Sequence, residues 1–462
     1  MELTQKIRRN RKFLAITGFF AALQLVLMLK VWQKPLIWDS AIYVGMGKYL
    51  FTGGSTGLWE VFRPPLLPVV AGALWKIGMP SIGFTRLLAL AFSFTGAGAV
   101  YFMVRDLYTK REAVTTVTLL LSSSLYFWYS NMLLTGLPAS MLLFASLYLV
   151  EKENYMAGGA LGGLAFLMRF PAAVVGPAAV AYVAYSYRDD WSTMVENAAV
   201  YTAAFFAVAA PYLLAMHYYY GSMLKPFIRG VAIPAATANT YMFGLYYVFH
   251  TLKSSPLLLA FPLGLYAVFR QRERNRYVFL SGLMFSYAFF TVFPHKEARF
   301  ALLFLPLLAL FGARGFESIF EELSDRGFHA SRAVKIVVLA SAVLMLASFL
   351  PAWGQNINTN AAEYYRAHSN LTGVVAANDP TIMAYGDIKY FPLPPATLED
   401  SFEKARQKAD YFSINSCAWY CTPGNTDCRA EIDQLEKTLE ANYTNVFELN
   451  GSYCNYSIYR AR

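Results

Sequence analysis

Residues 6–39 read KIRRNRKFLAITGFFAALQLVLMLKVWQKPLIWD. Five Lys and Arg residues precede an apolar stretch over about 13–32, and Asp39 closes the segment. About 20 apolar residues suffice for a helix that crosses a bilayer, and basic residues at one end favour the cytoplasmic side. The segment therefore predicts a first membrane span with a cytoplasmic N-terminus. It also predicts that Asp39 lies just outside the membrane on the opposite side.

The composition indicates a polytopic α-helical membrane protein. Hydrophobic residues make up 56% of the 462 residues and charged residues only 15%, whereas soluble proteins average about 25% charged residues. Further apolar stretches follow the first, which carries no small-residue cleavage site and is therefore not expected to be a cleaved signal peptide. The protein is predicted to lie in the plasma membrane of a prokaryote or archaeon, or in the endoplasmic reticulum membrane of a eukaryote.

Basic clusters set the expected topology. If the chain has eleven spans, with the N-terminus inside and the C-terminus outside, every strongly basic cluster falls on the cytoplasmic side. These clusters are Arg105–Arg111, Arg188, Arg270–Arg274 and Arg314–Lys335. The expected spans are about 13–32, 82–104, 113–130, 133–150, 156–168, 171–186, 198–216, 255–269, 277–293, 299–313 and 334–350. This positive-inside pattern explains much of the net charge of +10, so no nucleic-acid partner is expected.

The last 111 residues differ from the rest in charge, cysteine content and pattern. Residues 352–462 carry 9 Lys and Arg against 13 Asp and Glu. Short strands are expected at 373–377, 410–415, 445–449 and 456–460, with helices at 398–408 and 427–441 and a hairpin turn at Asn450-Gly451. We therefore expect two domains: a membrane module over 1–351, with an outer loop at 31–81 that holds juxtamembrane helices, and an extracytoplasmic α/β domain over 352–462.

The same tail holds every glycosylation sequon and every cysteine of the chain. The sequons begin at Asn370, Asn442, Asn450 and Asn455, and the cysteines are Cys417, Cys421, Cys428 and Cys454. Both features suit the secretory side of a membrane. Two disulfides are expected, in one of three pairings. A structural zinc site is the alternative, although the cysteine spacing fits no common zinc pattern.

Three groups of cations fall on the predicted outer side, where topology does not require them. Arg63 and Arg169 each stand just before a Pro, which favours a helix start, and His295, Lys296 and Arg299 open a span. Helix N-termini and Arg or Lys pairs bind phosphate well. These residues are therefore candidates for an anion site. Arg63 and Arg169 have an alternative role as anchors that reach the lipid head groups.

Asp39 has two competing interpretations. A carboxylate at this position can act as a general base. It can also serve as the N-cap of an amphipathic helix over 40–51.

The order and sidedness of these motifs resemble the GT-C glycosyltransferases. The chain resembles in particular the branch that contains protein mannosyltransferases and aminoarabinose transferases. The features that carry this resemblance are an acid after the first span, the segment Arg63-Pro64-Pro65-Leu66 and an Arg at 86. Leu161–Pro171 is similar to a helix junction of that branch, and His295–Phe300 resembles a His-Lys-Glu-x-Arg-Phe motif of dolichol-phosphate-mannose-dependent α-mannosyltransferases. The resemblance covers about residues 10–350.

The resemblance implies an inverting transfer of a mannose-like hexose from a polyprenyl or dolichyl monophosphate to an acceptor hydroxyl of a glycan, lipid or protein, on the extracytoplasmic side. Because phosphate leaves as a stable anion, one carboxylate suffices, unlike the pair in glycosidases. The implied roles are Asp39 as base, Arg63, Arg169, His295, Lys296 and Arg299 as phosphate ligands, and Trp38, Tyr43 and Glu297 as lining of the sugar and acceptor pocket.

Two departures limit what the resemblance implies. Asp39 is followed by Ser40 rather than a second acid, and Leu133–Pro138 lacks the acid that many relatives carry. Whether a divalent metal ion takes part is therefore left open, and no other cofactor is expected. The Trp-Trp-Asp-Tyr-Gly signature of oligosaccharyltransferases is absent. A transporter or flippase of lipid-linked sugars and a non-catalytic membrane scaffold are the alternative functions; an Asp39→Asn variant separates them from an enzyme.

Overall fold

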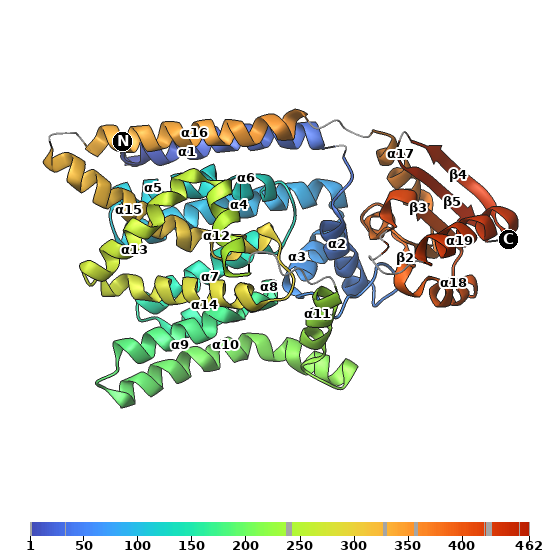
Figure 1. Ribbon diagram of the computed structural model, residues 1–462. Helices are drawn as coiled ribbons and strands as arrows, with labels where there is room; N and C mark the ends of the chain where they lie inside the picture. Colours follow the sequence, from blue (N-terminus) through green and yellow to red (C-terminus); the bar gives the residue numbers. More distant parts are fainter. Residues whose placement is uncertain are drawn as a thin grey trace. The chain divides into compact units, whose positions relative to one another are not determined.

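Figure 1 traces the computed structural model, which describes residues 2–32, 34–236, 243–326, 330–354, 359–419, 421, 427–451 and 453–461. Most of the described chain is helical, and one five-stranded sheet forms near the C-terminus. Packing divides the chain into two compact units. The first, here the helical unit, comprises Met1–Met28, Val61–Leu66 and Leu88–Gln355, and the second, here the mixed unit, comprises Leu29–Glu60, Leu67–Leu87 and Asn356–Arg462.

This division differs from the predicted one in the first loop. The sequence places 31–81 with the membrane module, whereas most of that loop packs with the C-terminal residues. The physical reason is that the first loop contacts residues of the C-terminal domain that are far away in sequence, and no local sequence pattern predicts such contacts.

The helical unit confirms the expected helical membrane fold and gives its elements. They are most of α1 (Glu2–Val31) and α4 (Ser81–Leu107), then α5 (Lys110–Ser122), α6 (Ser124–Tyr129), α7 (Gly136–Glu151), α8 (Tyr155–Met168), η1 (Phe170–Val174), α9 (Val175–Ser186), α10 (Trp191–Tyr220), α11 (Lys225–Ala236), η2 (Phe243–Leu245), α12 (Tyr246–Ser254), η3 (Pro256–Ala260), α13 (Phe261–Arg270), η4 (Arg274–Arg276), α14 (Tyr277–Val292), η5 (Ala298–Leu303), α15 (Leu305–Asp325) and α16 (Ala330–Gly354).

Four described helices are long and apolar enough to cross a membrane. They lie within α1, α4, α10 and α16, and a fifth candidate is the pair of α12 with the following helix, bent by 120°. Most of the other predicted spans fall on shorter helices, such as α7 with 16 residues and α8 with 14 residues, while the span predicted at 299–313 falls on η5 and the 21-residue α15. A helix of 16 residues is only about 24 Å long, less than the ~30 Å hydrocarbon core. The count of eleven crossings therefore stays a prediction.

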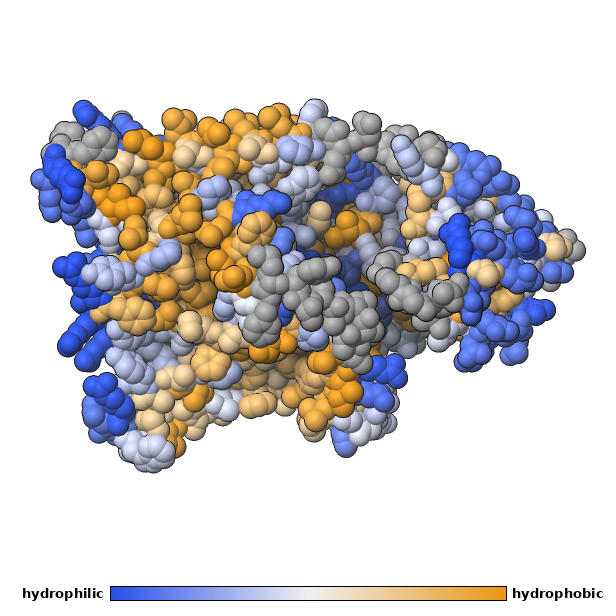
Figure 2. All heavy atoms as spheres, viewed as in Figure 1, coloured by the Kyte–Doolittle hydropathy of each residue, from blue (hydrophilic) through white to orange (hydrophobic). Residues whose placement is uncertain are grey.

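Apolar residues cover the visible face of the helical unit, and hydrophilic residues gather at the end from which the turns between α9 and α10 and between α13 and α14 emerge (Figure 2). Large side chains such as Leu339 and Leu214 are 67% and 56% exposed. Exposed apolar surface on this scale is expected where a protein contacts lipid rather than water.

The C-terminal sheet has the strand order β2-β1-β3-β5-β4. Its strands are β1 (Val374–Ala377), β2 (Lys389–Pro392), β3 (Tyr411–Asn415), β4 (Thr444–Asn450) and β5 (Asn455–Arg460). The first three pair in parallel, and β5 runs antiparallel to both β3 and β4. Four of these strands are predicted from the sequence. The strand β2, which is short and ends in Pro392, is not predicted from the sequence.

Two helices cover this sheet with apolar faces. α18 (Leu398–Arg406) and α19 (Cys428–Asn442) contribute Phe402 and Leu439 to a core that also holds Phe412 of β3. α17 (Thr359–Ala367) begins the domain and is not predicted. The tail is therefore a small α/β domain, as expected.

All four cysteines are paired, which confirms the expected disulfides over a zinc site. Cys417 bonds to Cys454 and Cys421 bonds to Cys428. The first bond joins the residues after β3 to the connection between β4 and β5.

Two juxtamembrane helices pack with this domain in the mixed unit. They are α2 (Trp38–Phe51) and α3 (Leu66–Lys76). They approach closely at Gly47 and Gly72: a Cβ on Gly47 would lie 2.5 Å from the backbone nitrogen of Gly72. Gly57 then forms an isolated parallel bridge with Lys389 of β2, and its backbone N–H donates to the Ile388 carbonyl at 2.7 Å. The first loop is thus bonded to the edge of the C-terminal sheet.

Candidate active site

The segment 293–300 does not open as a helix. The predicted helical turn over His295, Lys296 and Arg299 is wrong: the 3₁₀ helix η5 begins only at Ala298, and Glu297 has extended dihedrals. The side chains therefore diverge from an extended segment between α14 and η5 rather than from one helical face. This conformation gives Glu297 and Lys296 the separate partners described next.

Glu297 is bonded to the two neighbouring side chains of His295 and Arg299. Its carboxylate contacts the His295 ring nitrogen Nε2 at 2.9 Å and accepts a hydrogen bond from Arg299 Nη2 at 3.0 Å, with a second contact to Arg299 Nε. Burial acts to raise the pKa of Glu297, but the bonds from Arg299 and His295 outweigh it and hold that pKa below its usual value. The three side chains are 23–31% exposed. Glu297 is thus an ionised residue that positions His295 and Arg299.

The Lys296 side chain bonds to backbone carbonyls at the C-terminal end of α14. Its side chain is 5% exposed. Its ammonium donates to the carbonyls of Phe290, Thr291 and Phe293 at 2.5–2.8 Å. Burial lowers the pKa of Lys296. An ammonium has three N–H donors, and a cation at a helix C-terminus compensates the macrodipole. The structure thus gives Lys296 a set of partners different from the predicted phosphate.

Arg169 lies close to the same segment. It is the N-cap residue of η1, immediately after α8, and Pro171 follows at the start of that helix. Its guanidinium donates to Thr135 Oγ1 at 3.3 Å and lies 5.1 Å from the centre of the Phe300 ring. The Arg299 guanidinium lies 6.0 Å from the same ring. The fold thus brings Arg169 to Phe300, together with His295 and Arg299, which lie more than 120 residues further along the sequence.

The remaining predicted phosphate ligand, Arg63, lies in the connection before α3, and its guanidinium is 5.5 Å from the Phe62 ring. It is half-buried. It belongs to the helical unit, whereas Asp39 belongs to the mixed unit.

Asp39 is not the N-cap of its helix. α2 begins at Trp38, its N-cap is Ile37, and Asp39 is the acid of the first turn. The cap interpretation therefore does not explain the residue, although a carboxylate in the first turn is favoured by the macrodipole. Asp39 is half-buried and the neighbouring Trp38 is 46% exposed, while Tyr43 is 5% exposed. Of the predicted pocket residues, Trp38 is accessible and Tyr43 is largely enclosed. Glu297 is bonded to His295 and Arg299.

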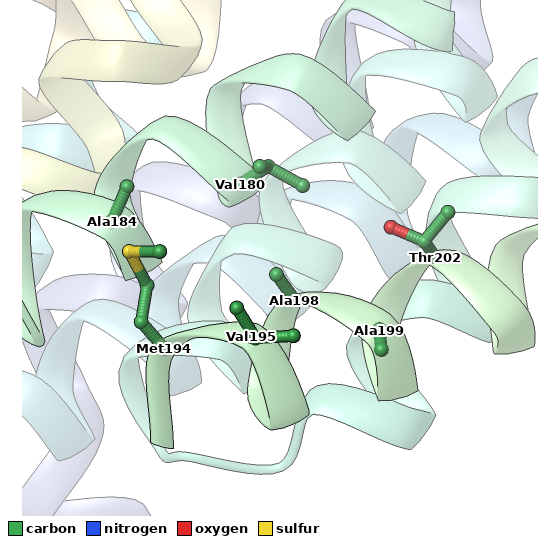
Figure 3. A pocket seen from close by; sticks show the side chains of 7 residues that line it. All are labelled: Val180, Ala184, Met194, Val195, Ala198, Ala199 and Thr202. Carbon is green, nitrogen blue, oxygen red and sulfur yellow. The ribbon is translucent and has the colours of Figure 1, made fainter. Parts of the chain in front are cut away.

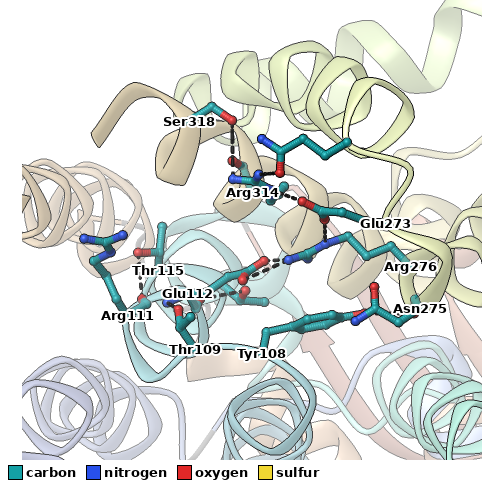
Figure 4. A network of polar contacts seen from close by, with 12 residues as sticks. Tyr108, Thr109, Arg111, Glu112, Thr115, Glu273, Asn275, Arg276, Arg314 and Ser318 are labelled. Atoms are coloured by element: carbon teal, nitrogen blue, oxygen red, sulfur yellow. Dashed lines mark hydrogen bonds and ion pairs between the residues drawn. The ribbon is translucent and has the colours of Figure 1, made fainter. Parts of the chain in front are cut away.

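A second charged cluster lies at the opposite end of α14. Arg276, just before this helix, donates to Glu112 at 2.5 and 3.0 Å and contacts Glu273, which in turn accepts from Arg314 at 2.7 Å (Figure 4). Arg276 also stacks 3.9 Å from the Tyr108 ring centre. Glu112 and Arg276 are 3% and 5% exposed.

This network joins three of the segments predicted to be cytoplasmic. The residues come from the start of α5, the turn before α14 and the middle of α15. Opposite charges match within it, so the network stabilises the helical unit. By contrast, the cluster around Phe300 gathers the guanidiniums of Arg169 and Arg299, groups that suit the binding of an anion such as phosphate.

An apolar hollow of about 330 Å³ lies between α9 and α10 (Figure 3). Its lining residues are Val180, Ala184, Met194, Val195, Ala198, Ala199 and Thr202. This lining offers one hydroxyl and no acid, base or cation. It suits a hydrocarbon chain rather than a reaction.

Within the described parts of the chain, no three His, Cys, Asp or Glu side chains are grouped so that they could hold a metal ion.

The profile of the Alg9-like mannosyltransferase family matches residues 13–367. The chain belongs to this family. It is therefore a glycosyltransferase of the GT-C type, as the resemblance implies, rather than a transporter or a scaffold. The match includes α2 with Asp39 and the three basic segments of the helical unit, at Arg63, Arg169 and 295–299.

Solved structures of this type share the fold. ArnT from Cupriavidus metallidurans bound to undecaprenyl phosphate is 13% identical, with a TM-score of 0.70 over 96% of this chain and 98% of that chain. Its apo state gives a TM-score of 0.65. The Archaeoglobus fulgidus oligosaccharyltransferase, in complex with Zn and sulfate, is 14% identical with a TM-score of 0.53 over 86% of this chain and 68% of that chain. No curated protein matches the chain.

Proposed function

We propose that this glycosyltransferase moves a mannose-like hexose from a polyprenyl or dolichyl monophosphate to an acceptor hydroxyl, on the extracytoplasmic side, with inversion of the anomeric carbon. The observation that carries the proposal is the cluster around Phe300, where the guanidiniums of Arg169 and Arg299 lie within 6.0 Å of one ring. Membership of a mannosyltransferase family supports the sugar, and the lipid in the ArnT structure supports the donor.

In this mechanism Arg169, Arg299 and His295 bind the donor phosphate, with Arg63 as a further candidate. Charge builds on that phosphate as the bond to the sugar breaks, and fixed cations stabilise it. Glu297 keeps the Arg299 guanidinium and the His295 ring oriented. Lys296, bonded to three carbonyls, instead fixes the end of α14 from which the segment departs.

Asp39 acts as the general base that takes the proton of the acceptor hydroxyl. Its first-turn position fixes it on a rigid element, and the accessible Trp38 beside it offers a surface for an acceptor. The sidedness rests on the basic loops. The buried network of Arg276 lies on the predicted cytoplasmic end of α14, and the segment with Arg299 follows the other end.

The test uses the purified full chain in liposomes with a radiolabelled polyprenyl-phosphate mannose and a membrane glycan extract as acceptor. Asp39→Asn should reduce turnover at least about 100-fold, the lower end for loss of a general base. Asp189→Asn changes a carboxylate that is 93% exposed and serves as the matched control. Near-normal transfer by Asp39→Asn would overturn the assignment of the base. Donors that carry glucose or galactose test the choice of mannose.

A further inference from the structure

A second hollow, of about 360 Å³, lies wholly within the mixed unit. It is bounded by the last turn of α2, the end of α3, the start of α4 and the turn after η7 (Pro380–Ala384). Its lining residues are Lys48, Trp75, Gly78, Met79, Pro80, Ser81, Ile82, Ala384, Tyr385 and Asp387. This size is within the ~300–1,000 Å³ range of small-molecule sites. None of these residues belongs to the cluster around Phe300.

Lys48 forms the inner wall of the hollow. It is 2% exposed and donates to the Gly386 carbonyl at 2.9 Å, and its ammonium lies 2.9 Å from Asp387 Oδ1. Burial lowers the pKa of Lys48, although Asp387 acts to raise it. Asp387 itself is 63% exposed, so one side of its carboxylate stays available to a ligand.

The charge of this wall selects against anions. Lys48 and Asp387 neutralise each other, and the more accessible partner is the carboxylate. A phosphate or a second carboxylate would meet like charge there, which is unfavourable. A neutral ligand with several hydroxyl groups matches the pair, because carboxylates accept hydrogen bonds and ammonium groups donate them.

Two aromatic side chains complete the match to a sugar. Trp75 lies 5.9 Å from the Lys48 ammonium, and Tyr385 lines the hollow from the C-terminal domain. Aromatic rings offer broad apolar faces that suit the C–H face of a sugar ring, and Tyr adds a polar end. The Ser81 hydroxyl adds a further hydrogen-bonding group to the same lining.

We propose that this hollow binds a neutral sugar unit of an oligosaccharide acceptor. The inference rests on the proposed function. Asp39 and Lys48 stand in the first and last turns of α2, about 13 Å apart along its axis. The sugar held beside Lys48 is therefore not the unit that receives the hexose but another unit of the same glycan. The hollow would thus select acceptors that are already several sugars long.

The experiment measures binding without donor, by saturation-transfer NMR on the full chain in nanodiscs. The probes are mannotriose, maltotriose and chitotriose, with glycerol 3-phosphate as an anionic head-group probe. Asp387→Asn should weaken binding of the preferred trisaccharide about tenfold, the loss expected for one hydrogen bond to a charged group. Trp75→Leu should also weaken it about tenfold, because the sugar loses an aromatic face. Asp400→Asn, an exposed carboxylate on α18, is the matched control and should change nothing.

Three outcomes would overturn the proposal: no trisaccharide binds, both variants bind the trisaccharide as tightly as the native chain, or only glycerol 3-phosphate binds. The last would identify a lipid head-group site instead. Thermal unfolding of each variant checks that the mixed unit is intact, and Asp387→Asn is the safer variant because its side chain is largely exposed. Since this readout needs no turnover, it can fail while Asp39 still proves to be the base, and the reverse also holds.

Discussion

Arg299 donates to Glu297 through Nη2 at 3.0 Å, and that carboxylate also holds His295. The arrangement keeps the Arg299 guanidinium and the His295 ring in place before any substrate arrives. Such pre-organisation matters for a phosphate leaving group, because the protein then does not reorganise when charge develops.

Arg299 and its neighbour Lys296 should behave differently when removed. Arg299→Ala should raise the Michaelis constant for the lipid donor about tenfold to a hundredfold, the loss of a hydrogen bond to a charged group, and leave that for the acceptor unchanged. Lys296→Met should instead lower the thermal stability, because three carbonyls at the end of α14 lose their donor. Initial rates at varied donor and acceptor, with an unfolding curve for each variant, measure both effects. Equal donor kinetics in Arg299→Ala and the native enzyme would place the phosphate elsewhere.

The buried network of Glu112 and Arg276, at the other end of α14, should contribute to the stability of the helical unit and not to the transfer reaction. Glu112→Gln removes one carboxylate from Arg276, and leaving a buried charge less compensated costs about 3 kcal/mol. Glu322→Gln breaks an exposed pair with Arg326 and should cost less than about 1 kcal/mol. Thermal inactivation in detergent compares the two. Equal losses would mean that the network is no stronger than a surface ion pair.

The C-terminal domain should lose stability in mild acid through His368. This residue is buried, its Nε2 lies 2.7 Å from Ser413 Oγ, and burial lowers its pKa to about 4. Between the ordinary value of 6.5 and about 4 the unfolded chain binds the proton and the folded chain does not. Stability is therefore full above pH 6.5 and falls by about 3 kcal/mol as the pH drops toward 4.

Hydrogen exchange of β3 amides against pH gives the measurement for His368. The slope in this window should vanish in His368→Gln, whatever that variant does to absolute stability. A slope that persists would assign the acid sensitivity to another group.

The two disulfides should contribute unequally. Cys417 and Cys454 are separated by 37 residues, while Cys421 and Cys428 are separated by 7. Loop-closure entropy gives about 4 kcal/mol for the longer loop and about 2 kcal/mol for the shorter one. Unfolding curves of the two double Cys→Ser variants test the order. Thiol labelling of the unreduced, denatured protein should find no free cysteine.

Local patterns were sufficient for much of the fold. Four strands of the tail follow from alternation, and long apolar stretches gave the helices. Sequence reasoning also selected Arg169 and Arg299, which the fold brings to one ring. It could not choose among three disulfide pairings, because cysteine spacing does not fix which sulfurs meet.

Other features depend on tertiary contacts that no local signal carries. The role of Lys296 depends on an extended segment where the sequence predicts a helix start. Lys48 gave no signal on its own, because its partners lie 338 residues further along the chain. A lone Lys within an apolar helix followed by a Gly-rich turn was the only available hint.

The hydrogen bond between Lys48 and Gly386 also determines how late in synthesis the first loop can complete its contacts. The loop that carries Asp39 leaves the ribosome early, but the residues that Lys48 and Gly57 bind are made 338 and about 330 residues later. At about 5–20 residues per second, the loop waits roughly 20 to 70 s for its partner. Until then, the loop that carries Asp39, the proposed base, lacks the contacts of Lys48 and Gly57 with the C-terminal domain. A chain that terminates before Gly386 therefore lacks the residues to which Lys48 and Gly57 bond.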